Sequence, residues 1–324
     1  MNYGNNKKTI RHIFLVFVFS YATILPVFSQ VEAQLSQYMF HPEAFNPASM
    51  GENGMAHAIG QYRTQWVGMP GAPETMYFSV NAPFVAKKNT HAIGITFLND
   101  KAGAFINQSA SLQYAFKKKV GKGLLSVGAN LGFMSIGFDA DSAKNEIQSE
   151  YHDAVDPIVP MIDENGMGFD VTLGAYYSTP KYYAGISYVH LNNPSFKLGD
   201  KSVFHATGIT YINGGFDVNL EETKFVLKPS TLIKTDFTTF QVDVSTRLEY
   251  DKKYWGGLSY RLQDAVTLLG GISLANGISL GYSYDLPTGK LLTVTSGSHE
   301  FFLSYGFALD MSKNKKRYKS IRIL

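Results

Sequence analysis

Short segments in which apolar and polar residues alternate recur along most of this chain. In residues 240–250, FQVDVSTRLEY, the even positions are apolar except for Thr246, and the odd positions are all polar. Successive side chains of a strand point to opposite faces of a sheet, so a period of two predicts strands with one apolar and one polar face. In residues 61–83 a segment rich in Gly and Pro separates two such runs, which predicts a hairpin.

Most of these segments are about ten residues long, the length with which a tilted strand crosses a bilayer. After the first 29 residues, no stretch approaches the ~20 apolar residues of a membrane helix. Strands in lipid must pair all their backbone groups, so the sheet has to close. We therefore predict an all-β fold, a transmembrane outer-membrane β-barrel of about 14 antiparallel strands. The predicted strands are 54–66, 74–82, 90–99, 105–116, 123–138, 167–179, 181–190, 202–213, 224–234, 240–250, 253–263, 265–274, 276–285 and 299–309.

The barrel hypothesis assigns the apolar faces to lipid and the polar faces to a lumen. Met76, Phe78 and Val80 are then expected to face lipid, with their polar neighbours inside. A soluble secreted β-sandwich or jelly roll is the alternative. Many Tyr and Phe residues lie at strand ends, as in the aromatic girdles of membrane barrels, which favours the barrel.

Composition agrees with an exported membrane protein. Charged residues make up 17% of the 324 residues, below the roughly 25% of soluble domains. The chain has no Cys, which excludes disulfides and acylation of a lipoprotein cysteine. A basic start and the apolar run 13–25 predict a signal peptide over residues 1–29, with cleavage after Ser29 or after Ala33. A retained anchor is the alternative, although the run is short for a membrane span.

The remaining chain divides into a periplasmic N-terminal segment, 30–53, a barrel, 54–310, and a basic tail, 311–324. An even strand number puts both termini on the periplasmic side. Loop lengths agree, because the longest connection, 139–165, then falls outside and most periplasmic turns are short; the turn near 214–223 is an exception. Without the basic signal and tail, residues 30–312 hold 20 basic and 26 acidic residues, so the sequence pI of 8.7 is no evidence for nucleic-acid binding.

Several stretches together resemble the PorP/SprF family of outer-membrane proteins, which is tied to the type IX secretion system. They are QYMFHPEAFNPASMG (37–51), YRTQW (62–66), GAPETMYFSVNAP (71–83) and YDLPTGKLLTVTSGSHEFFLSYGFAL (284–309). The resemblance covers residues 34–310, nearly all of the exported chain. His41 departs from the Asn that the family commonly has before Pro, and the tail extends beyond the usual end.

This resemblance implies a secretion role and no catalysis. Family members are associated with delivering or anchoring secreted proteins, including adhesins of gliding motility, at the cell surface. The implied partners are an adhesin-type secreted substrate, periplasmic or peptidoglycan-associated subunits of the system, and membrane lipid. No cofactor is implied.

Motifs for catalysis are missing from the sequence. It contains no G-x-S-x-G, H-E-x-x-H, P-loop or EF-hand pattern, so we expect no enzyme activity. The eight His residues are scattered and form no tight metal pair. The acidic loop 139–165 offers carboxylates that suit Ca²⁺, but its spacing matches no defined calcium loop and a solvated surface loop is the simpler interpretation.

Charged residues on the polar faces are the candidates for contacts within the lumen. They either grip a docked segment or pair with one another, because a luminal charge costs less when paired. Asn46 and Pro47 form a fixed turn before the first strand, which we expect at the periplasmic mouth. The candidate luminal residues are Arg63, Gln65, Trp66, Asp243, Arg247, Glu249 and Arg261, with Asp285 as a further acidic partner.

Two functions remain open at this point. The first is a barrel of the type IX system that holds a secreted protein or a machinery subunit. The second is a porin or FadL-like barrel that passes small or apolar solutes, because an Asn-Pro-Ala box also occurs in the hatch of fatty-acid transport barrels. An open or gated lumen would favour transport, and a plugged lumen would favour anchoring.

Overall fold

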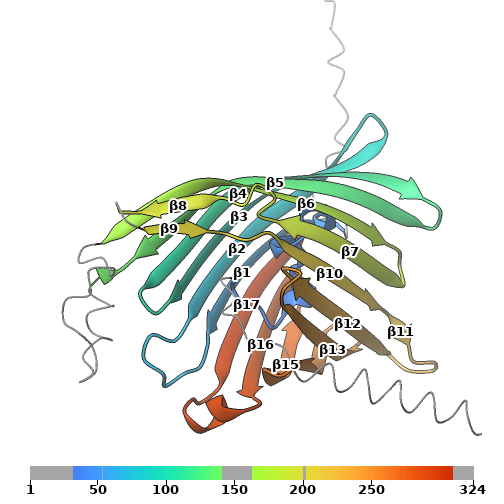
Figure 1. Cartoon of the computed structure of the whole chain (residues 1–324). Coiled ribbons are helices and arrows are strands. Elements are labelled where there is room, and N and C mark those ends of the chain that lie inside the picture. The colour runs from blue at the N-terminus through green and yellow to red at the C-terminus, as the bar shows by residue number, and fades with distance from the viewer. Residues whose placement is uncertain (1–31, 53, 141–162, 200–201, 309–324) are drawn as a thin grey trace, which may run out of the picture.

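The computed structural model describes residues 32–52, 54–140, 163–199 and 202–308 (Figure 1). The predictions for the signal peptide, the basic tail and the greater part of the acidic loop lie outside these residues. No helix in the described ranges is both long and apolar enough to cross a membrane.

The described chain is a single antiparallel barrel with a short hairpin and three 3₁₀ turns before the first strand. The turns are η1 (Tyr38–Phe40), η2 (Pro42–Ala44) and η3 (Pro47–Ser49), and η4 (Lys290–Thr293) precedes the last strand. The strands are β1 (Ala56–Thr64), β2 (Glu74–Ala86), β3 (Asn89–Ala102), β4 (Phe105–Val120), β5 (Gly123–Phe138), β6 (Glu164–Ser178), β7 (Tyr182–Val189), β8 (Ser195–Leu198), β9 (Ser202–His205), β10 (Ile209–Phe216), β11 (Val218–Asn219), β12 (Phe225–Thr235), β13 (Phe240–Tyr250), β14 (Tyr254–Arg261), β15 (Ala265–Ser273), β16 (Ile278–Pro287) and β17 (Ser298–Phe307).

The sheet closes on itself, because β1 pairs with β17 along its whole length and β10 pairs with β12. Fourteen strands form the ring; β8 and β9 pair only with each other, and β11 extends the edge beside β12. The predicted barrel is confirmed, and the β-sandwich alternative is wrong. Closure leaves no free sheet edge in the ring, as a membrane environment requires.

The predicted faces are also confirmed. Along β2, Met76 and Phe78 are 51% and 45% exposed, whereas the alternate residues Thr75 and Ser79 are almost fully buried. The outer surface of the barrel is therefore apolar, and the inner surface carries the polar side chains. A soluble protein has its apolar side chains inside and its polar side chains outside, and here the arrangement is reversed. This is what a barrel with lipid outside and a polar lumen inside requires.

One predicted strand is wrong. Residues 202–213 form two strands, β9 and β10, separated by residues 206–208. β9 folds back on β8, and this hairpin lies over the inner face of β5 and β6. There Phe196 is fully buried against Gly166 and Gly168, whose missing side chains leave room for its ring. Because Phe196 is buried in this apolar contact, the hairpin packs against the inside of the barrel and is not part of the ring.

The two ends of the barrel differ in the length of their connections. Residues 87–88, 121–122 and 179–181 are short turns at the end where β1 begins and β17 ends, which we call the short-turn end. The opposite, long-loop end carries the connections after β1, β5, β7 and β16. In Figure 1 the tips of β4–β7 at the short-turn end point to the right.

The N-terminal segment lies inside the barrel, and its turn at Asn46 and Pro47 is bonded near the short-turn ends of β6 and β7. Gln37, His41, Asn46 and Ala48 are completely buried. We call residues 32–52 the plug. They run from the long-loop half of the lumen to the short-turn end, where β1 begins.

Candidate functional site in the barrel lumen

The turn Asn46-Pro47 lies close to the barrel wall because the wall residues that face it are glycines, which have no side chains. Gly174 and Gly185, on β6 and β7, face Asn46, and a Cβ atom at either position would collide with its amide. Gly128 on β5 leaves the same room for Ala48. The sequence predicted the fixed turn, but its glycine cradle comes from three strands far along the chain.

Asn46 uses this close approach to bond to the barrel wall. Its Nδ2 donates to the carbonyl oxygens of Ala175 and Ile186, at 3.1 and 3.3 Å. Its Oδ1 accepts from the backbone N–H of Ala48 at 3.1 Å. One amide therefore caps the η3 turn and fastens it to β6 and β7.

Two predicted luminal arginines meet around the plug residue Ser36. Arg63 Nη2 lies 2.8 Å from Asp285 Oδ2, and Arg63 Nη1 lies 3.3 Å from Glu300 Oε2. The backbone N–H groups of Ser36 and Gln37 also donate to the Glu300 carboxylate, at 2.7 and 2.8 Å. Carboxylates of β16 and β17 thus hold the plug and Arg63 together.

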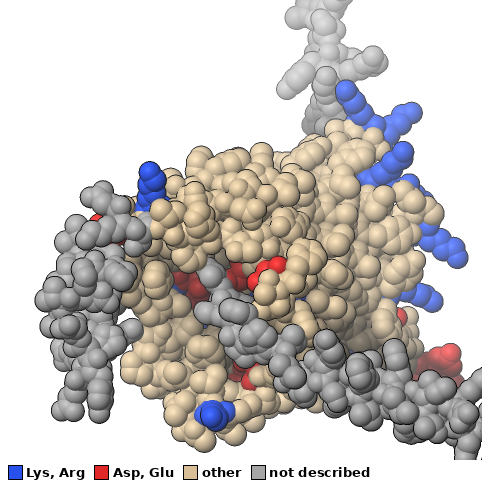
Figure 2. Space-filling model, in the orientation of Figure 1, with Lys and Arg blue, Asp and Glu red and all other residues tan. Residues whose placement is uncertain are grey.

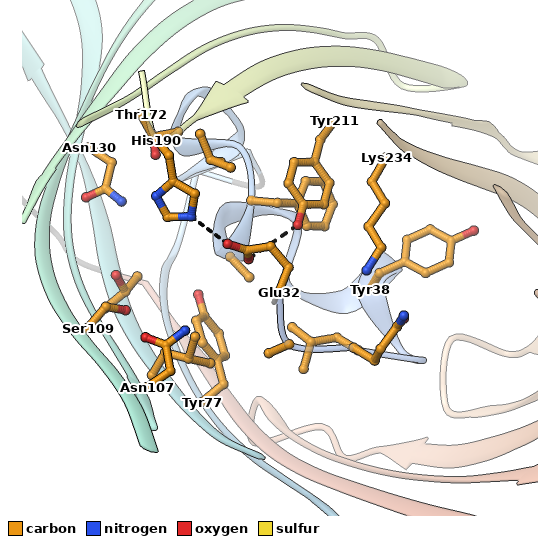
Figure 3. A pocket seen from close by; sticks show the side chains of 18 of the residues that line it. Glu32, Tyr38, Tyr77, Asn107, Ser109, Asn130, Thr172, His190, Tyr211 and Lys234 are labelled. Carbon is orange, nitrogen blue, oxygen red and sulfur yellow. Dashed lines mark hydrogen bonds and ion pairs between the residues drawn. The ribbon is translucent and has the colours of Figure 1, made fainter. Parts of the chain in front are cut away.

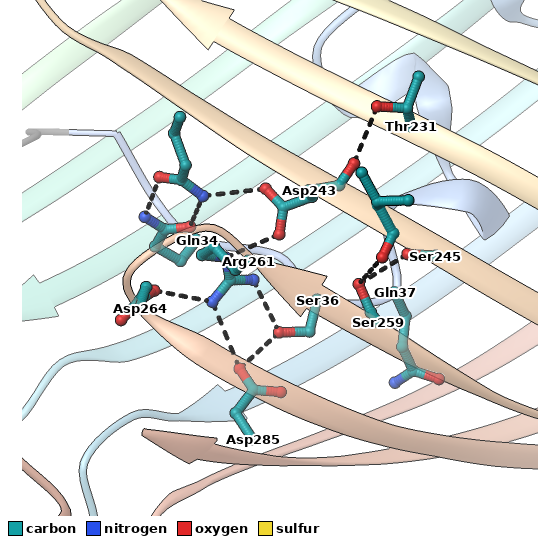
Figure 4. A network of polar contacts seen from close by, with 12 residues as sticks. Gln34, Ser36, Gln37, Thr231, Asp243, Ser245, Ser259, Arg261, Asp264 and Asp285 are labelled. Atoms are coloured by element: carbon teal, nitrogen blue, oxygen red, sulfur yellow. Dashed lines mark hydrogen bonds and ion pairs between the residues drawn. The ribbon is translucent and has the colours of Figure 1, made fainter. Parts of the chain in front are cut away.

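Arg261 completes this cluster from β14 (Figure 4). Its Nε donates to Asp243 at 2.8 Å and its Nη1 to Asp264 at 3.2 Å. Its Nη2 donates to the Ser36 hydroxyl at 3.0 Å, and that hydroxyl donates to Asp285 at 2.6 Å. Since Arg63 and Arg261 are 1% and 2% exposed, these are buried ion pairs whose separation would leave charges unpaired.

Two other predicted luminal residues, Arg247 and Glu249, lie outside this cluster. Glu249 pairs with Lys228 at 3.1 Å, and the Arg247 guanidinium lies over the ring of Phe40, 4.3 Å from its centroid. Phe40 itself packs against Trp255 and Phe302 on the wall, at centroid distances of 4.5 and 4.8 Å. Arg247 therefore holds the plug by a cation–π contact.

Gln65 and Trp66 do not join the luminal cluster. Both follow the end of β1, and their backbone N–H groups donate to Pro73 O and to the Ser298 hydroxyl. Trp66 adopts a φ of 48°, in the left-handed region. The two residues fix the start of the β1–β2 loop at the long-loop end.

Sequence reasoning missed the contacts that start at Glu32. His190 follows β7, and its Nε2 lies 2.6 Å from Glu32 while its Nδ1 lies 2.8 Å from Asp170. Burial alone lowers the pKa of His190, but its hydrogen bonds to Asp170 and Glu32 outweigh burial and raise the pKa to about 10. The imidazolium that joins the plug to β6 is therefore charged at neutral pH. Residues 32–37 have no alternating pattern that could have signalled these contacts.

A cavity that is partly open to solvent lies between the start of the plug and the inner face of β3–β6 (Figure 3). Asn107 and Asn130 face it from the wall, and each has a buried Oδ1 without a hydrogen-bond partner among the described residues. A second cavity lies at the short-turn end beside Met50, Glu52 and Tyr183. The two cavities share no lining residue, because the plug separates them.

The described residues give no support for a metal site. They contain no group of three or more His, Asp or Glu side chains that could hold an ion. Asp139, Asp163 and Glu164 of the acidic loop are described, but residues 141–162 are not, so the Ca²⁺ hypothesis is not tested.

Comparisons with solved structures give the following likenesses. The chain is 14% identical to the CymD monoaromatic hydrocarbon channel, with a TM-score of 0.49 and coverage of 85% of this chain and 93% of that one. It is 11% identical to the Ralstonia pickettii toluene transporter TbuX, with a TM-score of 0.49 and coverage of 84% and 93%. It is 7% identical to the Acinetobacter baumannii outer membrane protein Omp33, with a TM-score of 0.44 and coverage of 79% and 99%. No curated protein sequence matches it significantly.

Closed strands with an apolar exterior, around a lumen filled by the chain's own N-terminal segment, define an outer-membrane β-barrel with an internal plug. Residues 27–305 match the family model of the type IX secretion system membrane protein PorP/SprF. The chain belongs to this family, which confirms the resemblance seen in the sequence.

Proposed function

We propose that this barrel holds a secreted, adhesin-type protein at the outer membrane and contacts periplasmic subunits of the type IX system. Its task is then attachment, and the lumen carries no solute. No enzyme activity is expected, since the sequence offers no catalytic motif.

The observation that supports attachment is the plug. Buried charged side chains of β1, β14, β16 and β17 form hydrogen bonds with its Ser36 and Gln37, and the glycine cradle fixes it to β5, β6 and β7. Because the plug is bonded to opposite walls, it could not move toward either wall without breaking these hydrogen bonds. A barrel filled in this way is suited to bind a partner with its loops or rim.

We also infer that both termini of the barrel face the periplasm. The short turns lie at the end where β1 begins and β17 ends, and outer-membrane barrels keep their periplasmic turns short. The longer connections, including the acidic loop, then face the cell exterior, where a surface protein would be held.

Transport is the second candidate, and the two luminal cavities are the observation in its favour. A plug that moved would join them into one path. The hydroxyl and amide side chains of Thr96, Asn107, Ser109 and Asn130 along the first cavity suit a polar solute better than an apolar one.

The test is crosslinking in intact outer membranes, followed by purification of the tagged protein and mass spectrometry. A tagged unrelated barrel from the same cells is the matched control. Enrichment of a surface adhesin or of periplasmic type IX subunits over this control would support attachment. Equal recovery in both samples, together with steady single-channel conductance, would instead support the transporter.

A further inference from the structure

Exposed lysines collect at the short-turn end of the barrel. Figure 2 shows basic side chains gathered at the right of the molecule, where Figure 1 places the tips of β4–β7. All of these lysines lie in, or within a few residues of, the turns between strands. They are Lys87, Lys88, Lys118, Lys119, Lys122, Lys181, Lys224, Lys252 and Lys253.

Each group of these lysines adjoins an outward-facing aromatic residue. Lys181 precedes Tyr182, Lys224 precedes Phe225, and Lys252 and Lys253 lie between Tyr250 and Tyr254. Tyr182 and Tyr254 are 50% and 58% exposed. Exposed aromatic residues at strand ends mark the depth of the lipid headgroups.

The same arrangement holds on the longer strands β2–β4. Phe84 and His91 stack at a centroid distance of 5.2 Å, and Lys87 and Lys88 lie in the turn between them. Lys118 follows Phe116 on β4 and stands in register with Leu125, which is 42% exposed on the outer face. At about 3.3 Å per residue, eight of the nine lysines lie within roughly 10 Å of the aromatic level, and Lys122 lies in the turn just beyond them.

Five of the lysines form one arc without acidic neighbours, which we call the lysine arc: Lys87, Lys88, Lys118, Lys119 and Lys122. The segments 83–92 and 116–127 that carry them contain no Asp or Glu. None of the ion pairs found among the described residues involves the arc, whereas Lys224 and Lys253 share Asp251. The arc therefore carries positive charge that the described part of the protein leaves uncompensated.

The long-loop end has the opposite balance. Apart from the buried Lys234, its described lysines are Lys101, Lys197 and Lys290, and Lys101 is paired with Asp139 at 3.4 Å. Acidic side chains there include Glu74, Asp163 and Glu164. The barrel is thus polarised along its axis, with lysines concentrated at one headgroup level.

We propose that the lysine arc binds the phosphates of anionic phospholipids in the leaflet that surrounds the short-turn end. The lysines follow the aromatic level around the barrel, as the headgroups of a leaflet do. A docked protein would need charged side chains that project into water on one side of the barrel. The two-residue turns that carry the arc project little from the barrel, which suits lipid better than a protein partner. The flexible ammonium groups provide point charges that suit mobile headgroups.

The experiment measures lipid selectivity at the protein surface. The full protein is reconstituted into bilayers of phosphatidylcholine that contain trace spin-labelled phosphatidylglycerol or phosphatidylcholine, and the motionally restricted fraction of each label is compared. One lysine near an anionic headgroup contributes about a fivefold preference, so we expect phosphatidylglycerol to be favoured by about that factor at low salt. Salt should reduce the preference, because exposed charges are screened.

Variants decide whether the lysine arc is responsible. Replacing all five lysines by Gln should abolish the preference, and replacing them by Arg should preserve it. Replacing Lys101, Lys197 and Lys290 by Gln is the matched control and should leave it unchanged. Heat-modifiable gel mobility checks that each variant is folded. An unchanged preference in the Gln variant would overturn the proposal, as would a wild-type protein that lacks the preference but loses an acidic protein partner when the arc is neutralised.

Discussion

At the scale of single residues, Glu32 bears on where the chain is processed. Its carboxylate is bound by His190 at 2.6 Å and lies 3.5 Å from the Tyr211 hydroxyl. Cleavage after Ala33 would remove this residue and leave the charged His190 with Asp170 alone. We therefore expect the exported chain to begin upstream of Glu32, with cleavage after Ser29. The intact mass of protein purified from outer membranes tests this, and a mass that starts at Gln34 would contradict it.

His190 makes the attachment of the plug depend on pH. Its pKa in the folded protein, about 10, is raised above the ordinary value of 6.5. The stabilisation is therefore complete below about pH 6.5, declines as pH rises, and is lost above about pH 10. His190→Gln should thus lower the free energy of unfolding by about 1–3 kcal/mol at neutral pH, and much less above pH 10.

The measurement is the temperature of heat modification on gels, for both proteins, across this pH range. Replacing His205 by Gln serves as a control, because this histidine lies in the β8–β9 hairpin, outside the plug contacts. A difference between wild type and His190→Gln that stays constant with pH would show that the imidazolium has no such role.

The alternation of faces along a strand predicted the orientation of some of these side chains but not of others. Arg63, Asp243 and Arg261 were predicted to face the lumen, and the structure places all three there. Ser36 and Glu32 belong to a segment with no strand or helix period, so their positions depend on tertiary contacts alone. The side chain of Arg247 faces the lumen as predicted. Glu249, however, forms an ion pair with Lys228, and the Arg247 guanidinium lies over the ring of Phe40.

At the scale of elements, β4 provides a test of membrane depth. Leu112 and Val120 both face outward on this strand, and they are 67% and 44% exposed. Leu112 lies in the middle of the strand, and Val120 is its last residue. Arg at a midplane position costs about 2–4 kcal/mol and near the interface about 0–1 kcal/mol, so Leu112→Arg should destabilise the barrel far more than Val120→Arg.

Urea titration of the protein folded in vesicles gives both free energies, with Val120→Arg as the internal control. Equal losses for the two variants would mean that β4 does not cross the bilayer in the assigned way.

The boundaries of two strands were predicted correctly. The strands 123–138 and 240–250 agree with β5 and β13 residue for residue. The segment 202–213 was misread because Val203 and Phe204 continue a β pattern, although they belong to a separate hairpin. Periodicity identifies a strand but gives no information about its partner, and Phe196 finds its glycine pocket only in three dimensions.

At the scale of the whole molecule, the plug predicts a closed barrel. Wild-type protein in a planar bilayer should show no steady conductance. Gly174→Val should raise the conductance, since the new side chain would displace Asn46 from its cradle. Gly60→Val is the matched control, because a Cβ there meets nothing within 4 Å. A stable conductance in the wild type, or equal conductance in both variants, would contradict a lumen closed by the plug.

The bonds between Ser36, Gln37 and Glu300 also constrain the order of assembly. They join residues more than 260 positions apart, and the partner strand, β17, is the last to be synthesised. Without the plug, the closing strand would bury the Glu300 carboxylate with Arg63 as its only cation and without its backbone donors. Sealing of the β1–β17 seam is therefore favoured once the N-terminal segment is already in place. In kinetic terms, the first part of the exported chain serves as the internal template on which the last part completes folding.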